Sequence, residues 1–396
     1  MRRVSHNLMI VTPNEKRCFE MTKMRVLMVT PSFYPIEGGT EKMVQNLSIE
    51  LKKIGVHVDI LTFNMDQKWN PKWRKKIEKI DGITIFKVPA LNLLPRVPSP
   101  RINFNVNLIP GRFTRLMKDY DIIHFHEVEF SFPFFSYFVK KPKILHLHGI
   151  RPDYFKRYHL ARFILKNVAD IYLSLTKKMK NELIELGIPK DRIICFPNSV
   201  DSKIFQPKEK RTDNTILYVG RIVPRKCLHI LLKSLKDIKN PIDLEIIGPP
   251  GWNQDYNQTV LELVDSGNRR GKHKIRYLGR VDFPTLMTSY QKASIFVSSS
   301  SFEPFGVALL EAMSCETPVI STCTGGAAEV IKNGENGMLV PLNDPIKLAE
   351  AINYLLDNKN IRTKLGKAGR KTVTENYSIE VLVKTLCKLY EKLVCD

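Results

Sequence analysis

IFVSSSSFEPFGVALLEAMSCETPVIS, residues 295–321, is the stretch that decides the fold. Residues 295–297 predict a short apolar strand, residues 307–314 a helix, and residues 318–321 a second strand. A strand, a helix and a strand in this order predict a parallel βαβ unit. Pro304 and Gly306 mark the turn between the first strand and the helix. We therefore expect Glu303 in the loop before the helix and Glu311 one to two turns inside it.

The same alternation extends through the chain in both directions. Strands are predicted at residues 25–30, 57–63, 83–88, 122–125, 144–147, 171–173 and 193–195, and then at 215–219, 244–247, 275–278, 295–297, 318–321 and 338–340. Residues 205–214 are polar and charged, which is typical of a linker. We predict an N-terminal extension (1–23), two doubly wound α/β domains (24–206 and 207–375) and a C-terminal helix (376–396). A ligand would bind in the cleft between the domains, at the carboxyl ends of the strands.

Composition narrows the class of protein. The 396 residues are 43% hydrophobic and 26% charged, which argues against a disordered or collagen-like chain. The formal net charge is +22, and the first 206 residues carry most of this excess, which suggests an anionic partner. The seven cysteines form no C-x-x-C pair, so a reducing, cytoplasmic setting is expected. No apolar run is long enough to predict a membrane-spanning helix.

Three further turns carry residues suited to phosphate. Arg221 and Lys226 follow the first strand of the second half. Arg221 offers a planar guanidinium that can donate two parallel hydrogen bonds to a phosphate, and Lys226 offers an ammonium charge on a flexible side chain. Gly325 and Gly326 open a helix, as do Gly38 and Gly39 in the first half, and such turns let backbone N–H groups approach an anion. Each feature alone has a plainer interpretation. The cations could be surface charge, the glycines ordinary strand-to-helix turns, and Glu303 and Glu311 a helix-end charge and a solvated helix residue.

Taken together and in order, these motifs resemble the retaining glycosyltransferase family 4, which has the GT-B fold. The resemblance covers residues 24 to the C-terminus. It comprises Gly38-Gly39 with Glu41, His148-Gly149, Asn198-Ser199-Val200-Asp201, Gly220-Arg221 with Arg225-Lys226, Glu303 with Glu311, and Gly325-Gly326 with Glu329. Three residues depart from the family pattern, because Ser199, Cys227 and Glu316 stand where glycine is common.

The resemblance implies a role for each residue. Arg221 and Lys226 would hold the diphosphate of a UDP- or GDP-linked sugar and offset charge on the leaving group. Glu311 would bind the ribose hydroxyls and Glu303 the hydroxyls of the donor sugar. Phe305 and Gly306 would present backbone N–H groups to the donor, Gly38 and Gly39 would approach its phosphate, and His148 would face the donor sugar and the acceptor. No metal or other cofactor is implied, because the two cations take that role.

The acceptor is predicted only in outline, as a lipid-linked molecule or a glycan. Residues 68–80, KWNPKWRKKIEKI, begin at Lys68 and repeat Trp69, Trp73, Ile77 and Ile80 at helical spacing. Lysines take much of the remainder, so the segment predicts a helix lying on an anionic membrane. The alternative is a basic surface helix that packs on its own domain. We thus expect a cytoplasmic protein that can bind peripherally to the cytoplasmic face of a membrane.

Two other functions stay open at this stage. A nucleotide-sugar 2-epimerase with the GT-B fold would share the cleft and the diphosphate pocket. A nucleic-acid-binding protein would fit the net charge, but the sequence shows no RNP-type, zinc or helix-turn-helix signature, so no nucleic-acid partner is expected.

Overall fold

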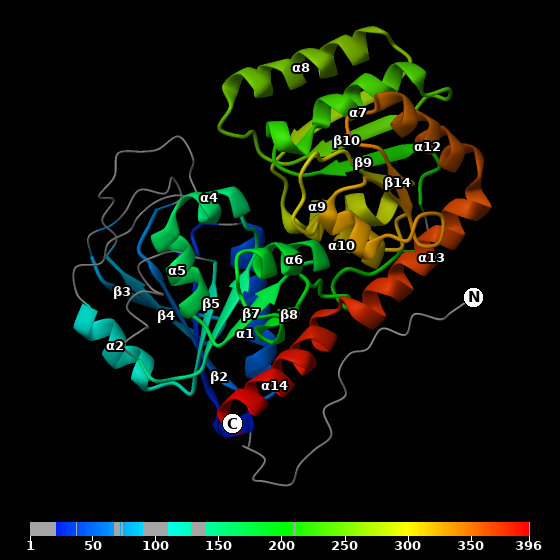
Figure 1. Cartoon of the computed structure of the whole chain (residues 1–396). Helices are drawn as coiled ribbons and strands as arrows, with labels where there is room; N and C mark the ends of the chain where they lie inside the picture. The colour runs from blue at the N-terminus through cyan, green and yellow to red at the C-terminus, as the bar shows by residue number, and fades with distance from the viewer. Residues whose placement is uncertain are drawn as a thin grey trace.

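The computed structural model describes residues 21–36, 38–66, 72, 74–89, 110–127, 139–208 and 211–395. Two sheets, each covered by helices, form two domains (Figure 1). Both sheets consist of parallel strands except for one strand at the edge of the first. The expected pair of doubly wound domains is therefore confirmed.

The first sheet has eight strands in the order β3-β4-β2-β1-β5-β6-β7-β8. Its strands are β1 (Arg25–Val29), β2 (His57–Phe63), β3 (Lys76–Ile80), β4 (Ile83–Val88), β5 (Ile122–His126), β6 (Lys143–Leu147), β7 (Ile171–Ser174) and β8 (Ile193–Cys195). The central strands β1, β5 and β6 are almost wholly buried, as a sheet covered on both faces requires.

The helices of the first domain lie between these strands. They are α1 (Gly39–Lys53), α2 (Pro110–Lys118), α4 (Pro152–Arg157), α5 (His159–Asn167) and α6 (Lys177–Glu185), with short 3-10 turns η1 (Met21–Lys23) and η2 (Lys190–Arg192). α1 buries Met43, Leu47 and Leu51 at the spacing of four that predicts it. Tyr158, whose backbone is extended, separates α4 from α5.

The prediction of a membrane-binding helix over residues 68–80 is wrong for its second half. Residues 76–80 form β3, which pairs antiparallel with β4 at the edge of the first sheet. The cause is a two-residue turn at Asp81 and Gly82, both with positive φ, and an Asp-Gly pair of this kind closes a β-hairpin. Ile77 stays exposed on this strand. Trp69 and Trp73 lie outside the described residues.

The second sheet has six strands in the order β11-β10-β9-β12-β13-β14. They are β9 (Thr215–Val219), β10 (Asp243–Ile247), β11 (Lys274–Gly279), β12 (Ile295–Ser298), β13 (Val319–Thr322) and β14 (Met338–Val340). The helices around it are α7 (Leu228–Ser234), α8 (Gln254–Arg269), α9 (Phe283–Lys292), α10 (Val307–Ser314), α11 (Gly325–Val330) and α12 (Pro345–Asp357), with 3-10 turns η3 (Pro224–Lys226) and η4 (Leu235–Asp237).

The last two helices connect the domains. α13 (Lys359–Asn376) packs against α10 in the second domain, and α14 (Ile379–Cys395) crosses back to pack against α1 in the first (Figure 1). Leu386 and Tyr390 of α14 are buried in the core of the first domain. Val200 exchanges backbone hydrogen bonds with Tyr377 and Ile379 at the crossing point. The expected crossing of the C-terminal helix is thus confirmed. Among the helices described, none combines the length and apolar character that crossing a bilayer requires.

Candidate active site

A pocket lies at the carboxyl ends of three strands in the second sheet. Val219, Ser298 and Ser321 bring β9, β12 and β13 to its wall, and the remaining lining includes Lys226, Glu303 and Gly306. This edge is where doubly wound sheets bind their ligands. The structure therefore brings four of the predicted site residues into one pocket: Lys226 from one segment, and Glu303, Phe305 and Gly306 from another that is distant in the sequence.

Lys226 and Glu303 form an ion pair in this pocket. The Lys226 Nζ donates to the Glu303 carboxylate, and both side chains are largely buried. Such a pair presents a cation and a hydrogen-bond acceptor side by side. A ligand that carries both a phosphate and sugar hydroxyls fits this combination of charges.

The serine run before Glu303 positions Lys226, a role that sequence reasoning missed. Ser301 donates from its backbone N to the carbonyl of Arg225 at 2.9 Å, and Ser299 Oγ donates to the carbonyl of Cys227 at 3.0 Å. These bonds fasten η3 to the loop that carries Glu303. The clustering of four serines after a predicted strand was the only sequence signal of this function.

Glu311 is held on α10 by a buried tyrosine. The Tyr290 hydroxyl donates to Glu311 Oε2 at 2.7 Å. Burial raises the pKa of the Glu311 carboxyl to about 7, while the Tyr290 hydrogen bond and the Lys42 charge oppose that rise. Lys42 lies on α1, so its effect on the Glu311 pKa shows that the start of α1 in the first domain lies close to Glu311 in the second.

Arg221 is exposed just after β9 and faces the first domain. Burial raises the pKa of Glu41, on the first turn of α1. The positive charge of the nearby Arg221 guanidinium acts in the opposite direction and lowers this pKa. Ser32 Oγ also donates to the Glu41 carboxylate. The two domains therefore meet with Arg221 and Lys42 close to carboxylates of the opposite domain.

The glycine pair at the start of α1 leaves its backbone accessible. A Cβ added to Gly39 would meet no heavy atom within 4 Å, whereas one on Gly38 would contact the Glu41 carboxylate. Gly39 thus faces open space, where a ligand could approach its backbone. The approach of Gly38 and Gly39 to the phosphate stays a prediction.

Gly326, the second residue of the other glycine pair, has a packing role that the sequence did not predict. A Cβ on Gly326 would overlap the backbone of Phe305, and the Gly326 N–H donates to the Glu303 carbonyl at 3.2 Å. Gly326 therefore lets α11 pack against the loop before α10. Phe305 has its side chain buried in the core, and Gly306 is the N-cap residue just before α10, with a φ of +96° that favours glycine.

We expect Gly326→Ala to destabilise the protein, because the methyl group would push α11 away from Phe305. Overpacking of this kind costs about 1–3 kcal/mol of unfolding free energy. Thermal denaturation checks the effect, with Gly39→Ala as the matched control, since its Cβ would point into open space. Equal melting temperatures for the two variants would contradict the packing role of Gly326.

Glu329 of the same motif connects the two domains. Its carboxylate accepts a hydrogen bond of 2.6 Å from the backbone N of Lys177, at the start of α6 in the first domain. The N-terminus of a helix favours a negative charge beside it. The Gly-Gly-x-x-Glu motif therefore has two structural roles. Gly326 lets α11 pack against the loop that carries Glu303, and Glu329 joins the two domains.

His148 lies at the carboxyl end of β6 and is bound from within the first domain. Its Nε2 is 3.0 Å from His126 Nδ1, and Asn198 also forms a hydrogen bond with it. Burial lowers the pKa of His148 to about 4, so the imidazole is neutral near pH 7. The contact of His148 with the donor sugar stays a prediction.

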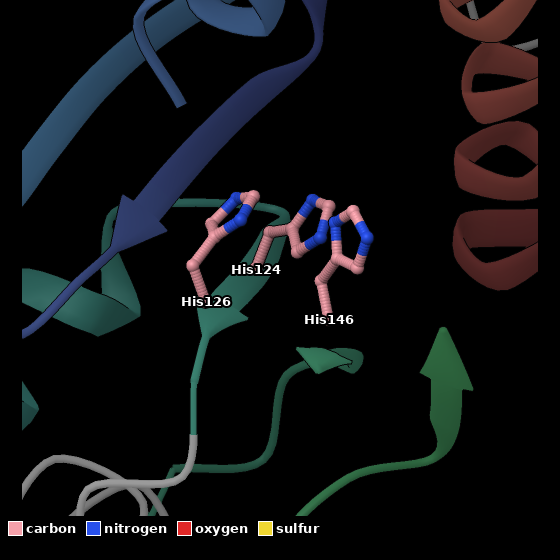
Figure 2. Close-up of side chains that lie close together, drawn as sticks. All are labelled: His124, His126 and His146. Carbon is pink, nitrogen blue, oxygen red and sulfur yellow. The ribbon is translucent and has the colours of Figure 1, made fainter. Parts of the chain in front are cut away.

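Three more histidines lie beside it, on β5 and β6 (Figure 2). His124, His126 and His146 are fully buried, and each offers a ring nitrogen within 4.8 Å of the others, as a metal ion would need. The rings of His124 and His126 stack with planes 20° apart, so their in-plane lone pairs do not converge on one point. His124 Nδ1 is also engaged by the Tyr390 hydroxyl at 2.7 Å. The arrangement fits core packing better than a metal centre.

An Asp-x-Asp sequence, Asp119 to Asp121, is another group that could chelate a nucleotide-bound metal. Asp121 Oδ2 accepts from the backbone N of Arg25 at 2.9 Å, at the amino ends of β1 and β5. The pocket with Lys226 lies at the opposite, carboxyl ends of strands in the other sheet. Asp121 is therefore part of the framework of the first sheet.

Comparison with protein families covers nearly the whole described chain. Residues 37–203 match the model for Glycosyltransferase Family 4, and residues 199–372 match that for Glycosyl transferases group 1. An uncharacterised glycosyltransferase of Methanocaldococcus jannaschii is 30% identical over 94% of this chain and 99% of its own. The O-antigen chain mannosyltransferase C of Escherichia coli is 25% identical over 94% of this chain and 99% of its own.

Solved structures show the same fold at lower identity. Sucrose-phosphate synthase from Thermosynechococcus elongatus superposes with a TM-score of 0.76 at 21% identity, covering 94% of this chain and 100% of its own. Anabaena HepE in complex with UDP-glucose gives a TM-score of 0.73 at 18% identity, covering 93% and 100%. The two facing α/β domains are those of GT-B glycosyltransferases, and the chain belongs to the glycosyl transferases group 1 family.

Proposed function

We propose that the protein transfers a hexosyl group from a nucleoside diphosphate sugar to a glycan or lipid-linked acceptor, with retention of anomeric configuration. The observation that carries this proposal is the Lys226–Glu303 pair, which lies in a pocket at the carboxyl ends of β9, β12 and β13. Glu311 and Arg221 lie where the domains meet. Glu311 would accept hydrogen bonds from the ribose hydroxyls, and Arg221 would offset the charge of the diphosphate. Anabaena HepE, which shares the fold, binds UDP-glucose.

In the proposed step, the bond between the sugar C1 and the diphosphate oxygen breaks. The acceptor hydroxyl oxygen forms the new bond to C1 on the same face, and its proton passes to the leaving diphosphate. Lys226 and Arg221 would offset the negative charge that develops on that diphosphate, which is the kind of stabilisation that lowers barriers most. Glu303 would accept from hydroxyls of the sugar, and Gly39 would present its backbone to the phosphate.

The class of acceptor is proposed from the relatives as well as from charge. One relative is an O-antigen chain mannosyltransferase, and another is the capsular polysaccharide biosynthesis glycosyltransferase CapM of Staphylococcus aureus, 26% identical over 64% of this chain and 72% of its own. Both names refer to the building of surface glycans. A basic first domain suits an acceptor that carries phosphate or lies on an anionic surface.

A panel of UDP- and GDP-linked sugars tests the proposal. A donor at about 100 times its Kd should stabilise the folded protein by about 2.7 kcal/mol in thermal unfolding. NMR spectra of the product should then show the anomeric configuration of the donor. Conversion of the nucleotide-sugar without any acceptor would indicate an epimerase, and an inverted product would contradict the retaining mechanism.

We expect transfer to continue after chelation of divalent metals with EDTA. The reason is that Arg221 and Lys226 would provide the positive charge beside the diphosphate. Initial rates before and after EDTA treatment check this expectation. Loss of all activity, restored by manganese, would contradict it.

A further inference from the structure

The first domain exposes apolar side chains on one short stretch. Tyr158, Leu160 and Phe163 are 48%, 73% and 62% exposed. Leu160 and Phe163 lie one turn apart on α5, whose inward face buries Ala161 and Leu165 in the core. α5 thus exposes two large apolar side chains on its outer face in addition to those it buries, and apolar residues that gather on a surface in this way often mark an interaction site.

Basic side chains surround these three residues. Residues 151–167 contain five lysines or arginines and one acidic residue, Asp153. Arg157 is exposed and its guanidinium lies 5.7 Å from the centre of the Tyr158 ring. Lys156 pairs with Glu185 of α6 at 3.3 Å, so part of its charge is balanced. The surface formed by α4 and the outer face of α5 therefore combines apolar anchors with excess positive charge.

This α4–α5 surface lies near the carboxyl edge of the first sheet. α4 begins at Pro152, shortly after β6 ends at Leu147 and after His148. Figure 1 shows α4 at the upper edge of the first domain, toward the second domain, with α5 running from it along the front. An object bound to this surface would therefore lie close to the carboxyl edge of the first sheet, where an acceptor would enter.

We propose that the α4–α5 surface docks on an anionic lipid bilayer, with Leu160 and Phe163 inserted at the interface, and that the acceptor is accordingly lipid-linked. This proposal rests on the proposed transferase function and names its class of acceptor. Aliphatic and aromatic anchors flanked by basic residues are what an interfacial helix needs. Three side chains offer far less area than the ~800 Å² per partner of a stable protein interface, so a bilayer fits better.

The surface is distinct from residues 68–80, for which the sequence predicts a membrane helix. There the described part is an edge strand, β3, whereas here the anchors lie on a regular helix with its own buried face. Phosphate headgroups would lie next to Arg157 and Lys156. Attraction of this kind weakens as ionic strength rises, because exposed charges are screened.

The test is co-sedimentation with phosphatidylcholine vesicles, with and without phosphatidylglycerol, of wild type and the Leu160→Ser/Phe163→Ser double variant. The matched control is Leu342→Ser/Ile346→Ser, which removes two apolar side chains of the second domain that are 45% and 56% exposed. We expect the α5 variant to bind phosphatidylglycerol vesicles at least about tenfold more weakly than wild type, and the control to bind like wild type. Binding should fall with added salt.

Equal binding by wild type and the α5 variant would overturn the proposal. So would sedimentation velocity showing that wild type self-associates through this surface and the variant does not, because the occupant would then be a second copy of the chain. Titration with a nucleotide-sugar, made on the same three proteins, keeps the two claims separate. Donor binding without vesicle binding refutes only the docking surface, whereas a protein that binds no nucleotide-sugar refutes the transferase function whatever the vesicles show.

Discussion

Replacing Lys226 with alanine should lower kcat/KM by about 10²–10³-fold, the usual cost of removing one group that stabilises charge in the transition state. Lys226 pairs with Glu303 in the pocket, so its loss also leaves an unpaired carboxylate facing the diphosphate. Steady-state rates at several donor concentrations measure the effect. Lys236→Ala, which removes an exposed lysine on η4, is the matched control.

A double variant separates the two causes of this loss. If the unpaired carboxylate contributes, Lys226→Ala/Glu303→Ala should be less impaired than the sum of the single variants predicts. A folded Lys226→Ala protein with the kcat/KM of wild type would show that the phosphate lies elsewhere.

Replacing Glu311 with alanine should weaken donor binding by about 100-fold at about pH 8, because hydrogen bonds to a charged group contribute about 1.5–3 kcal/mol each. The wild-type affinity should itself depend on pH. Burial raises the pKa of Glu311 to about 7, so the ionised form that accepts ribose hydroxyls becomes dominant only above that pH. We expect affinity for a nucleotide-sugar to rise between about pH 6 and about pH 8, by about tenfold.

Calorimetric titration across this pH range, with wild type and Glu311→Gln, measures the dependence. The Gln variant cannot ionise and should show a flat profile. Stability should change in the opposite direction. The folded pKa lies above the unfolded value, so the unfolding free energy of wild type should fall as pH rises from about 4.5 to about 7. The same pH profile of binding in both proteins would exclude Glu311 as the titrating group.

The regular elements could be predicted from the sequence because their patterns are strong and local. The run of buried residues in β1 and the spacing of four in α1 are examples. The secondary structure of residues 76–80 could not be predicted in the same way, because the lysines and isoleucines of this edge strand also fit the spacing of a helix. The Asp81-Gly82 turn was the signal that separates the two, since it closes a hairpin.

The candidate site was predictable in its residues but not in its contacts. The offset of Glu303 and Glu311 around a turn follows from the sequence, whereas the partners Lys226 and Tyr290 depend on how distant segments pack. Gly326 was expected to approach a phosphate, and it packs on Phe305 instead. An outward apolar face such as that of α5 has no local pattern that distinguishes it from a buried one.

Two departures from the family pattern also become intelligible. Cys227 and Glu316 stand where glycine is common, and both have positive φ, 48° and 60°. This region of backbone conformation costs a residue with a Cβ about 1–2 kcal/mol, which is why glycine suits both positions. Ser199 is buried beside Met43, with its Oγ 3.5 Å from the methionine Sδ, and nothing in its surroundings requires glycine.

A crystal structure with a nucleoside diphosphate sugar bound is the most direct test of where the donor lies. The predicted result is a diphosphate within hydrogen-bond distance of Lys226 Nζ and a ribose whose hydroxyls reach the Glu311 carboxylate. A second pocket, lined by Asp243, Arg276 and Thr285, lies between β10, β11 and α9 and could also admit a ligand. A donor bound there, or anywhere away from Lys226 and Glu311, would contradict the proposed active site.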